Sequence, residues 1–235
     1  MRYAVYFTFA PDEELGRVAT QWLGRDVFTG DRVSAPVLRH LNSAEIAFHT
    51  AAARRYGFHA TLKAPFRLAD GVHEDDLINE LHRFTAAETP FAIPGLRIGR
   101  LSRFFALVPS APAPELDAFA CNVVMNFDRF RAPLTEAEMA KRQPDQLSVA
   151  QLRNLYRWGY PHVLDCFRFH MTLTGPVQDH EAPAVRAALH EWFDEALAKP
   201  VGIASLSLFV ETEPGAPFQV REHVRMSAES QRMTA

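Results

Sequence analysis

Two stretches of this 235-residue chain repeat the phrase F-H-x-T-L-x-x-P, and each copy places a threonine two positions after a histidine. The first copy reads FHATLKAP from Phe58, and the second reads FHMTLTGP from Phe169. An imidazole can take up or release a proton near neutral pH, and a hydroxyl can donate a hydrogen bond to a charged oxygen. The candidate catalytic residues are therefore His59, Thr61, His170 and Thr172.

Both copies have the composition of β-strands, in which successive side chains point to opposite faces of a sheet. The apolar letters share one face, which predicts core positions for Phe58, Ala60, Leu62, Phe169, Met171 and Leu173. The histidines and threonines share the other face with three further polar residues. These candidates for substrate binding are Lys63 in the first copy, and Arg168 and Thr174 in the second.

This set of groups suits the cleavage of a phosphate ester. One proton must leave the attacking oxygen and another must reach the leaving oxygen, and two histidines on opposite sides of phosphorus could make both transfers. Threonine hydroxyls and nearby cations could stabilise the negative charge on the non-bridging oxygens. This chemistry requires no cofactor and no metal ion.

Other uses of these residue types fit the sequence less well. A zinc site would need carboxylate or thiol ligands at matching spacing, and none accompanies either histidine. The chain contains neither the G-x-S-x-G elbow of serine hydrolases nor the G-x-x-x-x-G-K-[ST] loop of ATP-binding enzymes.

Hydrophobic periodicity predicts strands and amphipathic helices around the two copies. The expected strands cover residues 2–9, 57–68, 96–102, 103–109, 166–176, 202–212 and 217–226. The expected helices cover residues 11–24, 44–55, 74–88, 114–127, 135–143, 148–159 and 180–198.

Each copy of the phrase is followed by a turn, a helix and two strands, which indicates an internal duplication. We expect an α+β protein of two similar lobes around a central cleft, each lobe a mostly antiparallel sheet with outer helices, related by a pseudo-twofold axis. Lobe 1 would cover about residues 1–112 and lobe 2 about residues 163–226. Residues 113–162 would link the lobes, partly as an insertion over the cleft, and residues 227–235 would form a polar tail.

Charge and composition limit the partners. The formal net charge of −3 disfavours long nucleic acid, which needs many basic contacts, but allows a small phosphorylated substrate. With two cysteines, no signal peptide and no membrane-length apolar run, we expect a cytoplasmic protein that does not contact a membrane. We also expect a monomer.

The paired motifs resemble those of the two-histidine (2H) phosphoesterase superfamily, which includes cyclic phosphodiesterases and RNA 2′,5′-ligase-like proteins. The longer phrases RYGFHATLKAPFRL and RWGYPHVLDCFRFHMTLTGP are similar to the branch of this superfamily named for phosphonate metabolism. The resemblance covers nearly the whole chain. It implies a bilobal fold, the two His-x-Thr motifs as catalytic groups, and metal-independent action on 2′,3′-cyclic phosphates or related phosphodiesters.

Three further residues are weaker candidates for the cleft: Tyr6 in the first strand, Tyr56 before the first copy, and Arg131 after helix 114–127. Tyr6 is equally consistent with ordinary strand packing, Tyr56 could stack on a base or sugar or simply pack, and a solvated surface position fits Arg131 better. The main hypothesis is a phosphoesterase that hydrolyses a cyclic phosphodiester of the 2′,3′-cyclic phosphate or cyclic ribose phosphate type. The alternative is a non-catalytic module that binds a phosphate ligand or an RNA end. RNA ligation would need a longer basic track.

Overall fold

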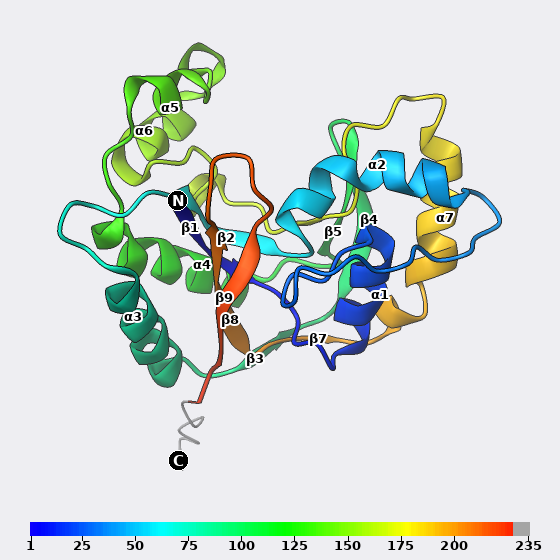
Figure 1. Ribbon diagram of the computed structural model, residues 1–235, viewed down its shortest axis with the longest axis horizontal. Helices are drawn as coiled ribbons and strands as arrows, with labels where there is room; N and C mark the ends of the chain where they lie inside the picture. The colour runs from blue at the N-terminus through cyan, green and yellow to red at the C-terminus, as the bar shows by residue number, and fades with distance from the viewer. Residues whose placement is uncertain (228–235) are drawn as a thin grey trace.

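The computed structural model describes residues 1–227 and has an α+β architecture. Figure 1 shows two lobes that meet in the middle of the molecule, with α5 and α6 projecting from one of them. The expected fold class, antiparallel sheets with outer helices, is confirmed. The expected tail of residues 227–235 lies outside the described residues apart from its first position. No helix within residues 1–227 has the length and apolar character needed to cross a membrane.

The elements alternate along the chain. The strands are Arg2–Phe7 (β1), Ala60–Phe66 (β2), Phe91–Ile93 (β3), Leu96–Leu101 (β4), Phe104–Pro109 (β5), Met171–Thr172 (β6), Val201–Ile203 (β7), Ser205–Glu211 (β8) and Gln219–Arg225 (β9). The helices are Glu14–Leu23 (α1), Ser43–Tyr56 (α2), Glu74–Ala87 (α3), Pro114–Phe127 (α4), Glu136–Ala140 (α5), Val149–Trp158 (α6) and Ala182–Phe193 (α7).

The large sheet has the strand order β4-β5-β6-β2-β1-β8-β9, so the strands that carry the repeated phrase, β2 and β6, are neighbours at its centre. They run antiparallel with Ala60 paired with Met171, and these residues are the same letter of the two copies. A second, two-stranded sheet pairs β3 with β7, again antiparallel. An antiparallel pair in which equivalent residues face each other has a local twofold axis between them, which agrees with the expected pseudo-twofold arrangement.

The order of elements after each phrase is also repeated, as β2-α3-β3-β4-β5 and β6-α7-β7-β8-β9. However, β5 of the first hairpin pairs with β6, and β8 of the second hairpin pairs with β1. Each spatial half therefore takes strands from both ends of the sequence, and the halves are not the stretches 1–112 and 163–226. The sequence could not show this exchange, because periodicity identifies a strand but not its partner.

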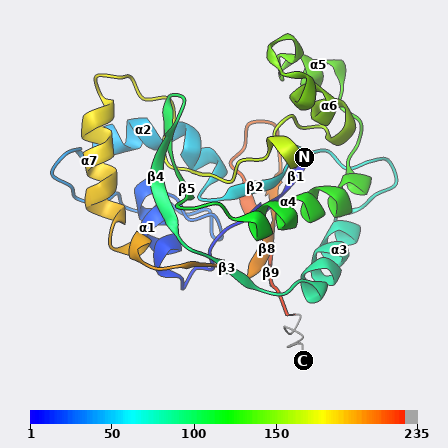
Figure 2. The same cartoon turned by 180° about the vertical axis from the view of Figure 1, so that it is seen from behind.

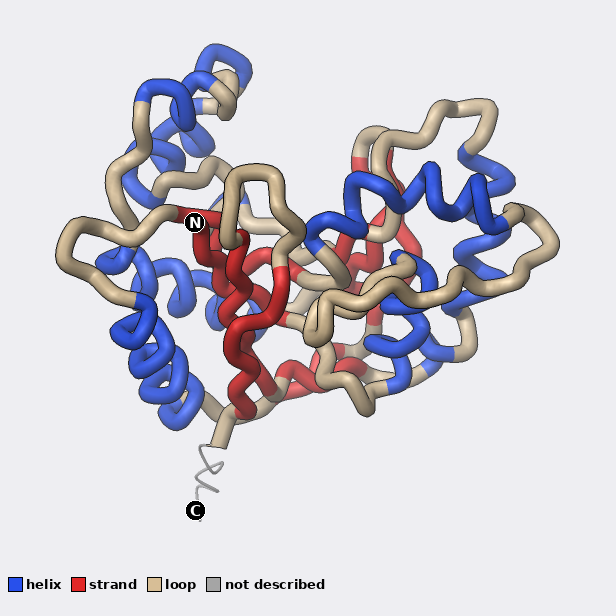
Figure 3. Tube along the Cα trace, viewed as in Figure 1, coloured by secondary structure: helices blue, strands red, loops and turns tan. Residues whose placement is uncertain are grey.

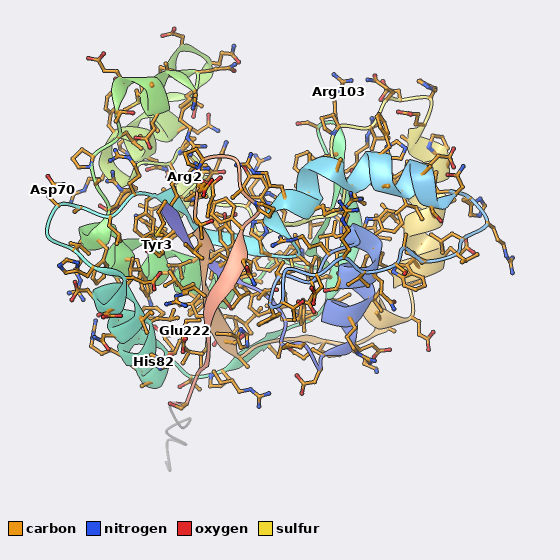
Figure 4. All side chains as sticks on the ribbon, in the orientation of Figure 1. Arg2, Tyr3, Asp70, His82, Arg103 and Glu222 are labelled. Carbon is orange, nitrogen blue, oxygen red and sulfur yellow. The ribbon has the colours of Figure 1, made fainter. Side chains whose placement is uncertain are left out.

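One face of the large sheet carries the main apolar core, to which α1, α3, α4 and α7 contribute. Figure 2 shows α3 and α4 over the strands of one lobe and α1 and α7 beside β4 in the other, and Figure 3 shows the strands between these outer helices. His82 and Glu222 join α3 to β9 at 3.1 Å (Figure 4). The predicted core positions are all buried in this core: Phe58, Ala60, Leu62, Phe169, Met171 and Leu173.

Most elements differ by a few residues from the expected bounds, and strand β3 was not expected; the start of α2 and the length of β6 have clear physical reasons. Helix α2 begins one residue earlier than expected, because the Asn42 side chain accepts hydrogen bonds from the first helical turn and Glu45 completes a capping box. Strand β6 has two residues instead of the expected stretch 166–176. Residues 166–168 and 170 line a cavity instead of pairing with a neighbouring strand, so the second phrase reaches the sheet only at its centre.

Candidate functional site

The four candidate catalytic side chains lie on the same face of the large sheet. Because the third letters of the two phrases are paired, the register places Thr61 opposite His170 and His59 opposite Thr172. All four side chains point away from the main core, since the alternate residues of both strands point into it. The two motifs therefore lie side by side on adjacent strands, whereas the sequence predicted that they would face each other from two lobes.

His59 is buried, with 9% of its surface exposed, and is held through both ring nitrogens. Nδ1 lies 3.0 Å from the carbonyl oxygen of Gly57, and Nε2 lies 3.2 Å from Thr61 Oγ1. Because a carbonyl can only accept, Nδ1 donates to Gly57 and Nε2 is the acceptor nitrogen. The ring also stacks on Tyr6, with centroids 3.9 Å apart. The tautomer and the orientation of this imidazole are therefore fixed.

Gly57 is the residue that allows this arrangement. It follows α2 and has φ 75, in the left-handed region that glycine adopts without strain. A Cβ at this position would lie 1.8 Å from Val27 Cγ1. The turn that aims the Gly57 carbonyl at His59 Nδ1 therefore depends on glycine.

The environment keeps the His59 imidazole neutral at pH 7. Burial lowers the pKa of His59 to about 4, the Gly57 carbonyl acts in the opposite direction, and His170 lowers the pKa further. The effect of His170 also means that the two imidazoles are close enough to repel each other when both are charged. His59 therefore presents an uncharged nitrogen that can accept a proton.

His170 is half-buried and lines a cavity of about 880 Å³ together with Thr61. Its Nδ1 donates to the carbonyl oxygen of Arg168 at 2.8 Å, which leaves Nε2 as the nitrogen available to a ligand. The ring of Phe104 lies beside it, with centroids 5.9 Å apart. The two histidines thus share one arrangement, because Nδ1 of each is bound by a backbone carbonyl two residues earlier.

Three tyrosines surround the histidines. Tyr6 is buried against His59, the ring of Tyr56 lies 6.2 Å from His59, and Tyr160 lines the cavity. Burial raises the pKa of Tyr6 well above its ordinary value, and Tyr56 and Tyr160 raise it further, whereas Thr61 acts in the opposite direction. Burial also raises the pKa of Tyr160. Both phenols therefore remain protonated, and a protonated phenol can donate a hydrogen bond to a phosphate oxygen.

The cavity lies between the β4–β5 hairpin, the phrase strands, and α6 with the loop that follows it. Figure 4 shows Arg103 at the outer end of this hairpin. The lining consists of Thr61, Arg100, Leu101, Ser102, Phe104, Ser148, Gln151, Tyr160, His162, Asp165, Cys166, Phe167, Arg168 and His170. Of the polar residues predicted for substrate binding, the structure brings Arg168 to this cavity and places Tyr6 and Tyr56 beside His59.

Lys63 and Arg131 do not reach the cavity, because both are bound to Asp128. Lys63 Nζ lies 2.5 Å and Arg131 Nε lies 2.9 Å from the same carboxylate oxygen. Burial lowers the pKa of Lys63 to about 8, and Asp128 opposes this shift. Burial would raise the pKa of Asp128, but hydrogen bonds from Arg131 and Lys63 lower it overall. The prediction that these two cations line the cleft is therefore not met.

The threonines of the second phrase have different positions. Thr174 is buried, accepts a hydrogen bond from the Phe105 amide at 2.9 Å and donates to the Gly175 carbonyl at 2.8 Å. It therefore stabilises the end of the phrase and does not contact the cavity. Thr172 is half-buried, pairs with Ala106 of β5 and is not among the residues that line the cavity.

Sequence reasoning missed several residues of the cavity. Phe104 comes from the β4–β5 hairpin, and Gln151 and His162 come from α6 and the loop after it. No local pattern marks them, because they meet His170 only through the exchange of hairpins and the return of the chain after α6. Tyr160, from the same loop, also lines the cavity.

The arrangement can perform acid–base chemistry on an anionic ligand. It provides His170 with an available Nε2, His59 with Nε2 linked to the cavity through Thr61 Oγ1, the protonated phenol of Tyr160 and the exposed cation Arg168. Among residues 1–227, no three His, Cys, Asp or Glu side chains come together in the way that would hold a metal ion.

The fold and the site define a class of α+β protein in which a duplicated His-x-Thr motif occupies two central antiparallel strands. Residues 61–219 match the family model described as "Protein of unknown function (DUF1045)", and the chain belongs to this family.

Two curated relatives carry the name ribose 1,5-bisphosphate phosphokinase PhnN. The protein from Janthinobacterium sp. (strain Marseille) is 38% identical over 235 residues, and the alignment covers 98% of this chain and 52% of the relative. The protein from Laribacter hongkongensis (strain HLHK9) is 36% identical over 222 residues, with 94% of this chain and 50% of the relative covered. The chain therefore spans about half the length of these relatives.

One solved structure, described as the crystal structure of a phosphoesterase, aligns with 97% of this chain and 98% of its own chain. The TM-score is 0.41 and the sequence identity is 10%, and neither value supports a conclusion about the site.

Proposed function

We propose that this chain is a phosphoesterase that hydrolyses a cyclic phosphodiester of the 2′,3′-cyclic phosphate or cyclic ribose phosphate type. The observation that carries the proposal is the pair of equivalent imidazoles on one face of adjacent strands, each with Nδ1 bound to a carbonyl. His170 Nε2 is available to a ligand, and His59 Nε2 is linked to the cavity through Thr61 Oγ1. Proton transfer to one oxygen and from another requires two such groups near one phosphorus.

In the proposed reaction, His59 is the base and His170 is the acid. Thr61 Oγ1 lines the cavity; it passes its proton to His59 Nε2, to which it is hydrogen-bonded, and takes one from water as the water oxygen attacks phosphorus. The bond from phosphorus to one ester oxygen breaks, and His170 Nε2 donates its proton to that oxygen, which gives a phosphomonoester and a hydroxyl. Solvent then restores both protonation states. The buried, neutral state of His59 and the greater exposure of His170 support this assignment.

A hydroxyl near the imidazoles would bind a non-bridging oxygen. Tyr160 lines the cavity and is a protonated donor, whereas the Thr61 hydroxyl proton is donated to His59 Nε2. Such donors act most strongly where charge develops in the transition state. Tyr6 stacks on His59 and would position the base without touching the substrate.

The names of the relatives point to a ribose phosphate as the substrate class. This chain aligns with about half of those proteins and contains no G-x-x-x-x-G-K-[ST] phosphate loop. The sequence therefore does not support assigning the kinase activity to the aligned half. A cyclic phosphate of ribose would open to a ribose phosphate monoester, the type of compound that the name describes. A role in phosphonate metabolism, expected from the resemblance, belongs to the same proposal.

The test is to replace each histidine and measure hydrolysis. His59→Ala and His170→Ala should each lower the rate by at least ~10², the lower end of the effect of general acid–base catalysis. Phosphorus NMR on 2′,3′-cyclic nucleotides and cyclic ribose phosphates would detect the monoester product, and circular dichroism would verify folding. His40→Ala, an exposed histidine outside the site, is the matched control. Binding of these compounds without product in the unmodified protein would instead indicate the non-catalytic module.

A further inference from the structure

The cavity beside His170 contains a cation that the proposed reaction does not use. Arg168 lines the cavity and is exposed. The other arginine of the lining, Arg100, is bound to Asp179 at 2.7 Å. Within residues 1–227, Arg168 forms no ion pair, so its guanidinium is available to a ligand.

The groups around Arg168 make this part of the cavity attractive to an anion. His162 lines the same wall, where burial lowers its pKa and its neighbours Arg168 and Arg142 lower it further. The one carboxylate of the lining, Asp165, is already paired with Arg153 at 2.7 Å. An anionic group bound here would be attracted to the Arg168 guanidinium, and His162 could donate a hydrogen bond to it.

The spacing separates this cation from the reacting phosphorus. Arg168 and His170 are two residues apart, and alternate side chains of an extended segment lie on one side about 7 Å apart. A group next to Arg168 would therefore lie about one sugar ring from a phosphorus bound at His170. The cavity volume of about 880 Å³ leaves room for a sugar and a second charged group.

We propose that the substrate carries a terminal phosphomonoester besides its cyclic diester, and that Arg168, His162 and Gln151 bind this second phosphate. The inference rests on the proposed function, because it assumes that the cyclic phosphate lies between the two motif histidines. Arginine suits a phosphate because its planar guanidinium donates two parallel hydrogen bonds to it. His162 and Gln151 are close together, with 3.4 Å between Nδ1 and the amide nitrogen, so they can contact the same group.

The first experiment compares kcat/KM for substrate pairs that differ only in the second phosphate. The pairs are a cyclic ribose phosphate and uridine 2′,3′-cyclic phosphate, each with and without a 5-position phosphate. In the unmodified protein, kcat/KM should be about ten- to a hundredfold higher for the doubly phosphorylated member. This ratio corresponds to the binding free energy of one or two hydrogen bonds to a charged group. Arg168→Gln should remove this preference, because kcat/KM of the doubly phosphorylated member should fall further than that of the singly phosphorylated member.

Two variants serve as controls. Arg168→Lys should keep part of the preference, because lysine retains the charge but not the planar fork. Arg157→Gln removes one exposed charge from α6 at a position outside the cavity lining. This variant should keep the full preference for the doubly phosphorylated substrate. Equal loss on both members of a pair in Arg168→Gln would show that Arg168 contacts the reacting phosphate. No preference in the unmodified protein would likewise overturn the inference.

A binding measurement separates the failure of this inference from the failure of the proposed function. Ribose 5-phosphate is titrated calorimetrically into the His59→Ala/His170→Ala protein, with and without Arg168→Gln. Affinity should fall about tenfold or more with the arginine removed. If no cyclic compound is hydrolysed, the proposed reaction fails, and this titration still decides whether Arg168 binds a phosphomonoester. Equal affinity in the two proteins would overturn the second-phosphate site.

Discussion

The burial of His59 couples the stability of the protein to pH. An unfolded histidine has a pKa near ~6.5, whereas burial lowers the pKa of His59 to about 4 in the folded protein. Between these two values the unfolded chain binds a proton that the folded chain does not bind. The contribution of His59 to stability is therefore fully present above pH ~6.5 and is lost as the pH falls toward 4.

We predict that His59→Gln flattens the acid side of the stability profile. Between pH 7 and pH 4 the unmodified protein should lose up to about 3 kcal/mol of unfolding free energy that the variant does not lose. Urea denaturation at a series of pH values measures this difference. The exposed His40→Gln should follow the unmodified protein. Parallel profiles for the unmodified protein and His59→Gln would contradict the lowered pKa.

The sequence predicted the face to which a side chain points wherever strand alternation alone determines it. Alternation correctly separated the core letters of both phrases from the histidines and threonines. It failed for Lys63, because a carboxylate 65 positions later attracts this side chain away from the cleft. A local pattern identifies the face of a strand but not the charged group that will bind a side chain on it.

At the scale of elements, Asp128 connects the turn after α4 to β2. Its carboxylate accepts from both Lys63 and Arg131, so one anion holds a strand and the start of the segment that leads to α5 and α6. The Lys63 side chain is only 3% exposed. An unpaired charge at such a depth is strongly unfavourable, which makes this contact structural.

We predict that Asp128→Ala lowers the free energy of unfolding by about 3 kcal/mol, because it leaves Lys63 buried without its anion. The double variant Lys63→Met/Asp128→Ala should recover a large part of this loss, since it removes the buried charge as well. Urea denaturation measures both effects. The folded fraction of Lys63→Met should keep its kcat/KM on cyclic phosphates. A loss of kcat/KM without a loss of stability would instead place Lys63 at the substrate.

At the scale of the whole molecule, the exchanged hairpins make the two halves of the sequence interdependent. Strand β6 lies between β5 and β2, and the β8–β9 hairpin extends the sheet from β1. A fragment that ends after residue 112 would contain the neighbours of β6 but not β6 itself. The lobes visible in Figure 1 are therefore not separate folding units.

We predict that fragments 1–112 and 113–227 are each unfolded alone and form the native sheet when mixed in equal amounts. Both would leave strand edges and apolar core surface exposed. The dispersion of amide signals in NMR spectra of each fragment and of the mixture shows whether each sample is folded. A dispersed spectrum with cooperative unfolding from either fragment alone would show that one lobe folds independently. The intact chain should unfold in one transition.

The duplication was predictable because the phrase and the order of elements after it are both written in the sequence. The exchange of hairpins was not predictable, because both alternative pairings satisfy the same strand periodicity. This is also why His162, Gln151 and Phe104 were missed, since their place beside His170 follows from the exchange and from the path of the loop after α6.

The requirement for glycine at position 57 limits how this protein can change over generations. Any other side chain there would collide with Val27 and would adopt a left-handed backbone angle that other residues resist. A compensating change of Val27 to a smaller residue would remove the collision but not the backbone strain. A substitution at this position would therefore disturb the turn after α2 and, with it, the carbonyl that binds His59 Nδ1.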